Sequence, residues 1–336
     1  MDSNVSKNTN SHNFFKLEVK REKLGISIKN LLKQELLLIF NSYRQKFDVQ
    51  IEQNNFASIL ENKIGISNYK YQLSKHFRSI TSLTETKFVP IVYSCPIGFL
   101  LAANQSHALQ IIMQQIKQLV SNRENVDLEL PSVLVEIVDR GWINFYLGSK
   151  FMAIWLEQSL AWHQRTIIND RAFAKKETCG LENTFTNLFP VQYIHARCCS
   201  LLNLAAREKL ISLSVDSPSI VRSMPTNIFL WNEQNTLWLT ESAERNLLQQ
   251  LLIVADSWVE DISDREACTE SNRQWSKLAF NLSQATAIFL ADCRFLGEAK
   301  RYPQLAIARL GLIALVQLWL QRILNEKFGV AASKLM

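Results

Sequence analysis

Tyr193, Arg197 and Ser200 are the residues whose types and spacing best fit a chemical task. They lie four and three positions apart, so in a helix they share one face and place an aromatic ring beside a guanidinium. A ring can stack an unpaired base and an arginine can hold a phosphate, which suits single-stranded RNA. Taken alone, the spacing favours a structural role, in which Tyr193 packs inside a bundle and Arg197 pairs with a carboxylate. His195, which lies between them, is expected to be a hydrogen-bonded structural histidine.

The other polar residues show no pattern for metal, nucleophilic or nucleotide chemistry. The five histidines have no H-E-x-x-H or His–Cys spacing, and the six cysteines form no C-x-x-C pair. No two of the nine glycines lie within six residues of each other, so a glycine-rich phosphate loop is absent from the sequence. We expect no catalytic residue, metal or cofactor, and the cysteine usage favours a reducing, cytoplasmic compartment.

Basic residues are concentrated near the amino terminus. The net charge is +6, and residues 7–46 contain nine Lys or Arg against three Glu, which equals the whole excess. Residues 187–336 hold 15 basic and 14 acidic side chains. A basic arm suits a polyanion, because each neutralised phosphate releases counterions. We take Lys29 and Lys33 as its candidate RNA contacts; a solvated helix face is the alternative for such a charge run.

Helices should dominate the fold, because glycine (9) and proline (7) are scarce and hairpin-rich folds need both. Residues 26–47 repeat apolar side chains at three- and four-residue spacing, which predicts an amphipathic helix. A β-prone run at 88–92, a helical pattern at 99–120 and an alternating stretch at 134–147 complete a small α+β domain. Gly141 is the expected turn of that last stretch.

The second half of the sequence predicts a helical bundle. Residues 150–163 are helical, and further helical patterns follow at 191–213, 241–259, 272–296 and 304–328. Pro303 interrupts the last two where a turn is required. No apolar run approaches the roughly 18 residues of a membrane span, and the amino terminus is unlike a signal peptide. We therefore expect no membrane contact and no export.

Two segments of this second half resemble one known domain. Residues 190–202 (PVQYIHARCCSLL) are similar to the helix that opens the DALR anticodon-binding domain of class I arginyl-tRNA synthetases, with the pattern Val-Gln-Tyr-Ala-His-Ala-Arg. The end of the chain resembles the end of that domain. The matching residues there are Cys293-Arg294-Phe295-Leu296, Ala308-Arg309-Leu310 and a terminal methionine, Met336.

The resemblance implies that Tyr193 and Arg197 approach an anticodon loop, and it adds Arg294, Arg309 and Met336 as candidate tRNA contacts. Pro190 stands where arginyl enzymes commonly carry an aromatic ring, and Gly297 stands where some members place another. These departures predict a loss of base-stacking surface, and with it a loss of specificity for the arginine anticodon.

A third segment, residues 141–160 (GWINFYLGSKFMAIWLEQSL), resembles the end of the amino-terminal additional domain of the same enzymes. The stretch associated there with the tRNA elbow, Gly-Asp-Tyr-Gln-x-Asn, is replaced by residues 89–95, of which only Tyr93 and Ser94 could still serve. About 30 residues separate Leu160 from Pro190, whereas a doubly wound catalytic domain needs well over about 100. No H-I-G-H or K-M-S-K-S signature occurs.

Together these patterns predict a mainly α protein with four parts. They are a mobile tail (1–13), an arginyl-tRNA synthetase amino-terminal-like α+β domain (14–160), a linker (161–186) and an all-helical DALR-type anticodon-binding domain (187–336). The resemblance implies a non-catalytic protein that holds tRNA, with arginine tRNA as one candidate, by its elbow and anticodon arm. The alternative is a protein-interaction scaffold that reuses the two accessory domains without binding RNA.

Overall fold

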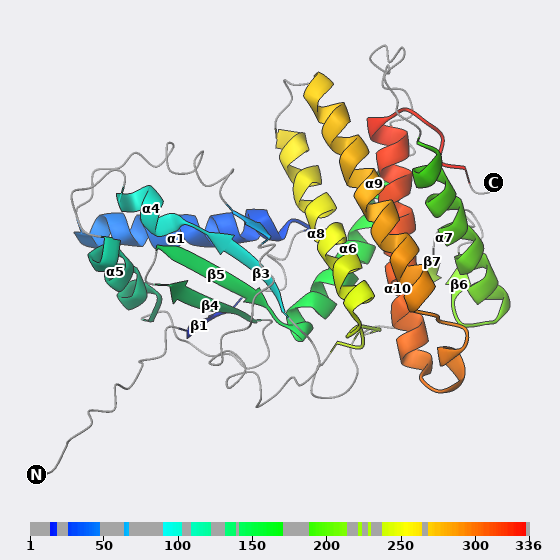
Figure 1. Cartoon of the computed structure of the whole chain (residues 1–336), viewed down its shortest axis with the longest axis horizontal. Helices are drawn as coiled ribbons and strands as arrows, with labels where there is room; N and C mark the ends of the chain where they lie inside the picture. Colours follow the sequence, from blue (N-terminus) through cyan, green and yellow to red (C-terminus); the bar gives the residue numbers. More distant parts are fainter. Residues whose placement is uncertain are drawn as a thin grey trace, which may run out of the picture. The chain divides into compact units, whose positions relative to one another are not determined.

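The protein is seen in a computed structural model with two compact units. The first comprises residues 1–19, 32–67 and 92–147, and the second comprises residues 20–31, 68–91 and 148–336. Most of the described chain is helical, which confirms the predicted mainly α class (Figure 1). The described residues are 14–18, 26–47, 64–66, 90–102, 109–121, 132–138, 141–170, 188–213, 221–223, 228–229, 237–263 and 268–333. The predicted tail, 1–13, lies outside them.

The first unit contains a five-stranded sheet in the order β1-β4-β5-β3-β2. β4 and β5 form an antiparallel hairpin, with Val133 opposite Leu147 and Val138 opposite Trp142. Gly141 turns the hairpin with a φ of 88°, which glycine adopts without strain. This confirms the turn predicted at Gly141. The strands are β1 (Phe14–Glu18), β2 (Gly65–Ile66), β3 (Ile91–Cys95), β4 (Ser132–Val138) and β5 (Trp142–Leu147).

Helices of the first unit supply the rest of its core. α1 (Ile28–Phe47) confirms the predicted amphipathic helix, and the helical pattern at 99–120 falls on α4 (Ile97–Ala102) and α5 (Leu109–Ser121). The Tyr43 hydroxyl of α1 donates a hydrogen bond of 2.9 Å to Gln115 Oε1 of α5. From Leu32 onward, α1 buries one stripe of side chains. That stripe consists of Leu32, Leu36, Ile39, Phe40 and Tyr43.

The second unit is the helical bundle predicted for the carboxy-terminal half. α10 is its central helix, packs against α6, α7 and α9, and continues into a π-helical turn, η3. A short hairpin, β6 (Ser212–Leu213) and β7 (Val221–Ser223), and the 3₁₀ turn η2 (Glu298–Lys300) connect helices. The helices are α6 (Ser149–Asp170), α7 (Phe189–Arg207), α8 (Ser242–Ser263), α9 (Cys268–Asp292), α10 (Pro303–Arg322) and η3 (Ile323–Lys327).

The helix from Pro303 to Lys327 is long and apolar enough to cross a membrane by length and composition alone. The prediction that no stretch approaches that length is therefore wrong for this helix. However, 78% of its apolar window is buried inside the structure. A helix that is apolar on all sides is expected at the centre of a large bundle as well as in a membrane. Its central position in the second unit accounts for its composition.

The boundary between the units differs from the predicted domain limits. α6 belongs to the second unit, so the division falls after Leu147 and not after residue 160. Trp155 of α6 is fully buried, and its Nε1 donates a hydrogen bond of 2.9 Å to the Ile26 carbonyl. The predicted linker, 161–186, begins inside α6, and residues 171–187 lie outside the described chain. Packing of the α6 aromatic residues explains the difference, because periodicity alone does not say which core a helix joins.

The first turn of α1 belongs to the second unit and is held by α8. Asp256 Oδ1 accepts hydrogen bonds of 2.9 Å from Ser27 Oγ and from the Lys29 backbone N–H. Ser27 Oγ in turn accepts the Asn30 N–H at 3.0 Å, so Ser27 caps the helix while Asp256 places a negative charge at its amino end. The Lys29 ammonium forms an ion pair with Glu260 of α8.

An aromatic cluster with cations surrounds the end of α10. The Arg322 guanidinium lies 4.5 Å from the ring centroid of Trp162 and 5.5 Å from that of Trp258. The ring of His163 meets Trp319 edge-to-face at 4.5 Å between centroids, and His163 is 1% exposed. Burial, and then the positive charge of Arg322, lower the pKa of His163 well below its usual value of 6.5.

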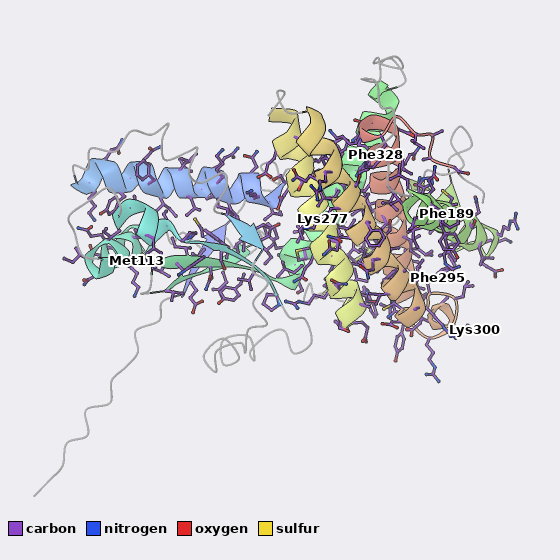
Figure 2. All side chains as sticks on the ribbon, turned by 45° about the horizontal axis from the view of Figure 1, so that its top comes forward. Met113, Phe189, Lys277, Phe295, Lys300 and Phe328 are labelled. Atoms are coloured by element: carbon purple, nitrogen blue, oxygen red, sulfur yellow. The ribbon has the colours of Figure 1, made fainter. Side chains whose placement is uncertain are left out.

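Gly98 in α4 marks a close backbone approach inside the first unit. Its N–H donates a hydrogen bond of 2.9 Å to the Gly141 carbonyl, and a Cβ at this position would lie 2.6 Å from Gly141 Cα. The same Cβ would lie 2.5 Å from the sulfur of Met113, which is labelled in Figure 2. We expect Gly98→Ala to lower the free energy of unfolding by about 1–3 kcal/mol, because backbone atoms cannot move aside easily.

Urea denaturation followed by circular dichroism measures this change. Gly148→Ala is the matched control, because a Cβ at Gly148 meets no atom within 4 Å. Equal stabilities of the Gly98 and Gly148 variants would contradict the close approach.

His163 should make the stability depend on pH. Because its pKa is lowered in the folded chain, the unfolded chain takes up a proton first as the pH falls. Its contribution to stability is therefore present above pH ~6.5 and is lost below it, with a slope of at most about 1.4 kcal/mol per pH unit. We expect His163→Phe, which keeps a ring in place, to flatten the stability profile between about pH 6.5 and about pH 5. Chemical denaturation at several pH values tests this, and an unchanged slope in the variant contradicts it.

Candidate nucleic-acid interface

Helix α7 positions the candidate site by burying one face and exposing the other. Pro190 lies in its first turn, where the missing N–H is not needed. The outward face leaves Phe189, Tyr193 and Arg197 exposed, and Phe189 is labelled in Figure 2. The inward face lies against α9 and α10. Its buried residues are Val191, Ile194, His195, Ala196, Cys198, Cys199, Leu202 and Ala205.

Phe189 and Tyr193 form an exposed two-ring stack. Their ring centroids are 6.3 Å apart and their planes differ by 21°. Phe189 is 59% exposed and Tyr193 is 43% exposed, so both rings offer faces to solvent. Arg197 lies one turn further along, and its Nη1 reaches the Tyr193 hydroxyl at 3.4 Å. We call Phe189, Tyr193 and Arg197 the α7 ladder; it combines two stacking surfaces with a cation that can hold a phosphate.

The sequence analysis did not predict a role for Phe189. The resemblance places an aromatic ring at position 190, and because Pro190 supplies none, it predicts a loss of stacking surface. The structure shows that Phe189 supplies a ring one position earlier. The signal in the sequence was its spacing of four from Tyr193, which places both residues on the same helix face.

The other polar residues of α7 have structural roles. His195 is 1% exposed, as predicted for a structural histidine. Its Nδ1 lies 2.8 Å from the Ser333 carbonyl, which can only accept, so Nδ1 carries the hydrogen. The other ring nitrogen then accepts a hydrogen bond from the Gln317 side-chain amide of α10 at 3.1 Å. Ser200 Oγ donates to the Ala196 carbonyl at 3.0 Å, so its hydroxyl proton is directed at the helix backbone.

A second group of exposed cations lies at the connection between α9 and α10. Arg294, Lys300 and Arg301 are all exposed, and none of them forms an ion pair with a described residue. Tyr302 is exposed beside them, and Figure 2 labels Lys300 at this end of the bundle. We call these four residues the basic corner. Because its three cations are exposed, they can contact phosphates, whereas the buried arginines of α10 cannot.

Arg309 is buried and holds the basic corner in place. Its Nε donates a hydrogen bond of 2.7 Å to Glu244 Oε1, and its Nη1 donates one of 2.7 Å to the Arg294 carbonyl. Glu244 Oε2 accepts the Glu241 N–H at 2.8 Å, which closes the first turn of α8. Burial raises the pKa of the Glu244 carboxyl, and the bond from Arg309 opposes that shift. The prediction that Arg309 contacts RNA does not fit this placement.

The remaining predicted contacts are placed less favourably than the α7 ladder. Lys29 forms an ion pair with Glu260, and Tyr93 is fully buried in β3. Ser94 Oγ donates to Asn144 Oδ1 at 2.8 Å within the sheet. Lys33 is half-buried on α1, and Met336 lies outside the described residues. The structure therefore brings together Tyr193 with Arg197, and it gives Lys29, Tyr93 and Arg309 roles in packing.

Comparisons with known proteins give a family match for the second half of the chain. Residues 191–336 match the profile of the DALR anticodon binding domain. The match covers the helical bundle from α7 onward, which we refer to as the DALR domain. An arginine–tRNA ligase of Synechococcus sp. (strain JA-3-3Ab) is 30% identical over 158 residues, which is 47% of this chain and 24% of the ligase. The chain is similar to part of this ligase, and the match spans about a quarter of the ligase's length. No solved structure matches.

Arg309 should stabilise the DALR domain and not bind RNA directly. We expect Arg309→Met to lower the free energy of unfolding by about 3–5 kcal/mol, because Glu244 would be left buried without its partner. Arg301→Met is the control; as an exposed substitution it should change stability by no more than about 0.5 kcal/mol. Urea denaturation of both variants measures the difference. A stable Arg309 variant that has lost only RNA binding would contradict this assignment.

Proposed function

We propose that this chain is a non-catalytic tRNA-binding protein. The α7 ladder stacks unpaired bases of the anticodon loop, and Arg197 holds a phosphate or a base edge beside them. The observation that carries the proposal is the exposed Phe189–Tyr193 stack with Arg197 one turn away, in a domain of the DALR type. Large aromatic side chains left half-exposed in adjacent turns are unusual unless a partner covers them.

The free cations of the DALR domain support RNA as that partner. Arg197 and the basic corner are exposed, whereas Arg309 and Lys327 are tied to carboxylates inside the bundle. Stacking on aromatic rings combined with phosphate contacts is the usual chemistry for single-stranded nucleic acid. Met336, which the DALR profile includes, remains a candidate contact at the end of the matched region.

Catalysis by this chain is not part of the proposal. α6 ends at Asp170 and α7 begins at Phe189, so little chain is left between them for a nucleotide-binding sheet of about 100 residues or more. Binding would therefore act by occupying tRNA, through delivery, protection or competition. We propose that the first unit contributes contacts to the tRNA elbow through basic residues such as Lys33, while Tyr93 and Ser94 support its sheet.

Arginine tRNA is the first candidate ligand, because the relative is an arginine–tRNA ligase. The cytoplasm is the proposed compartment. The cysteines Cys95, Cys198, Cys199 and Cys293 are free thiols, as a reducing environment would leave them.

Fluorescence anisotropy with labelled arginine tRNA and with total tRNA tests the proposal. We expect binding that weakens steeply between about 50 mM and about 200 mM salt, because phosphate contacts release counterions. Phe189→Ser and Tyr193→Ser should each weaken binding about tenfold, since each removes one stacking surface. Arg197→Gln should reduce the slope of log affinity against log salt by about one.

Phe280→Ser is the matched control, because Phe280 is a similarly exposed phenylalanine of the same domain on α9. It should bind tRNA like the unaltered chain. A tRNA transcript without its anticodon arm should bind more weakly and should no longer distinguish the Phe189 variant. Absence of salt-dependent binding, or equal effects at Phe189 and Phe280, would reject the proposal and leave the scaffold alternative.

A further inference from the structure

The outward face of α9 carries no charge over most of the helix. Between Lys277 and Asp292 the sequence contains no Asp, Glu, Lys or Arg. Phe280 is 50% exposed and Ile288 is 45% exposed on this face. Figure 1 shows α9 in front of α10 with no other helix drawn over it. The exposed residues, which we call the α9 outer face, are Lys277, Phe280, Gln284, Ala287, Ile288, Ala291 and Asp292.

Such a face is atypical of a helix that stays in water. Exposed helix faces normally carry charged side chains, whereas the centres of protein interfaces are depleted of charge and enriched in aromatic residues. The exposed side of the neighbouring helix α7 follows the usual pattern, with Arg197 and Arg207 exposed. The small residues Ala287 and Ala291 would also allow another helix to approach closely.

We propose that the α9 outer face docks a second copy of this chain, with the two α9 helices antiparallel and the two-fold axis at Gln284. In that register Phe280 and Ile288 are equally far from the axis, four residues on either side. Each Phe280 therefore packs beside Ile288 of the second copy. A two-fold interface requires this kind of self-complementary surface.

The charges at the ends of the face fit the same axis. Lys277 lies seven residues before Gln284 and Asp292 lies eight after it, so each Lys277 reaches Asp292 of the second copy. Two equivalent ion pairs then close the interface at both ends. Parallel helices would instead bring Lys277 against Lys277, and like charges oppose association. Neither residue forms an ion pair with a described residue of its own chain.

The expected dimer is weak and reversible. One helix pair crossing over a few turns buries at most about 1,000 Å², the lower end of the range for specific complexes. We therefore expect a dissociation constant in the range of about 10–100 µM. The inference does not depend on tRNA binding, because α7 and α9 expose different residues.

Sedimentation velocity of the full chain, freed of nucleic acid, over a series of protein concentrations tests the proposal. A monomer–dimer equilibrium is expected. Phe280→Ser should raise the dimer dissociation constant at least about tenfold, because it removes an aromatic anchor from the centre of the interface. Phe189→Ser, on the α7 ladder, should leave the equilibrium unchanged. Circular dichroism checks that both variants are folded.

A charge exchange distinguishes a second copy from any other partner. Lys277→Glu and Asp292→Lys should each weaken the dimer about threefold or more, and the double variant should restore it. Oxidation should also cross-link Gln284→Cys into a disulfide-bonded dimer, because position 284 lies on the axis. Gln274→Cys, which is exposed on the same helix but far from the axis, should not cross-link.

A chain that stays monomeric at about 200 µM, twice the upper limit expected for the dissociation constant, overturns the proposal. So does a dimer that Phe280→Ser or the charge reversals leave intact. Salt-dependent tRNA binding without a dimer would reject this inference alone, and a dimer without tRNA binding would reject the proposed function alone.

Discussion

The DALR domain depends on a central helix, α10, that is apolar on all sides and yet carries polar residues. Each of the polar residues discussed below contacts a specific neighbour, because burying a polar group without a partner costs on the order of 2–7 kcal/mol. Arg309 is paired with Glu244 and bound to the Arg294 carbonyl, which fixes the start of α8 and the basic corner. Gln317 donates to His195 of α7. Arg322 lies between two indole rings and bonds to Glu326. The polar residues of α10 therefore set where the surrounding helices lie.

This arrangement divides the cations of the second unit into two groups. Lys29, Arg309, Arg322 and Lys327 are bound to carboxylates or lie over aromatic rings, so their charges hold elements together. A further group is exposed on α7 and at the basic corner. Ion pairs within the domain remove equal numbers of positive and negative charges, so residues 187–336 stay nearly neutral overall. What favours RNA binding is that the exposed cations are grouped on α7 and at the basic corner.

Periodicity and resemblance predicted the helices and the main features of the α7 site, but not the partners of buried charges. The spacing of apolar residues placed α1 and α7 to α10, and Gly141 marked the β4–β5 turn. That Tyr193 and Arg197 are neighbours could be predicted from the sequence, because residues four positions apart lie one helical turn from each other. The sequence does not show that Arg309 pairs with Glu244 or Lys29 with Glu260, because these partners lie far away in sequence and a buried arginine looks the same in sequence as an exposed one. Phe189 was not predicted, because the resemblance concerns the ring at position 190, although Phe189 lies four residues before Tyr193 in the sequence.

The outward faces of α7 and α9 differ in ways that separate their partners. The α7 ladder presents flat rings next to a cation, and the basic corner adds three more cations that no described carboxylate neutralises. A second copy of the chain docked there would bring like charges together, which opposes association. The α9 outer face has a different composition: its central residues carry no charge that would attract a phosphate, while Phe280 of one copy is matched by Ile288 of the other. Because cations are required on the α7 ladder, whereas charge lies only at the two ends of the α9 outer face, neither surface can easily substitute for its neighbour.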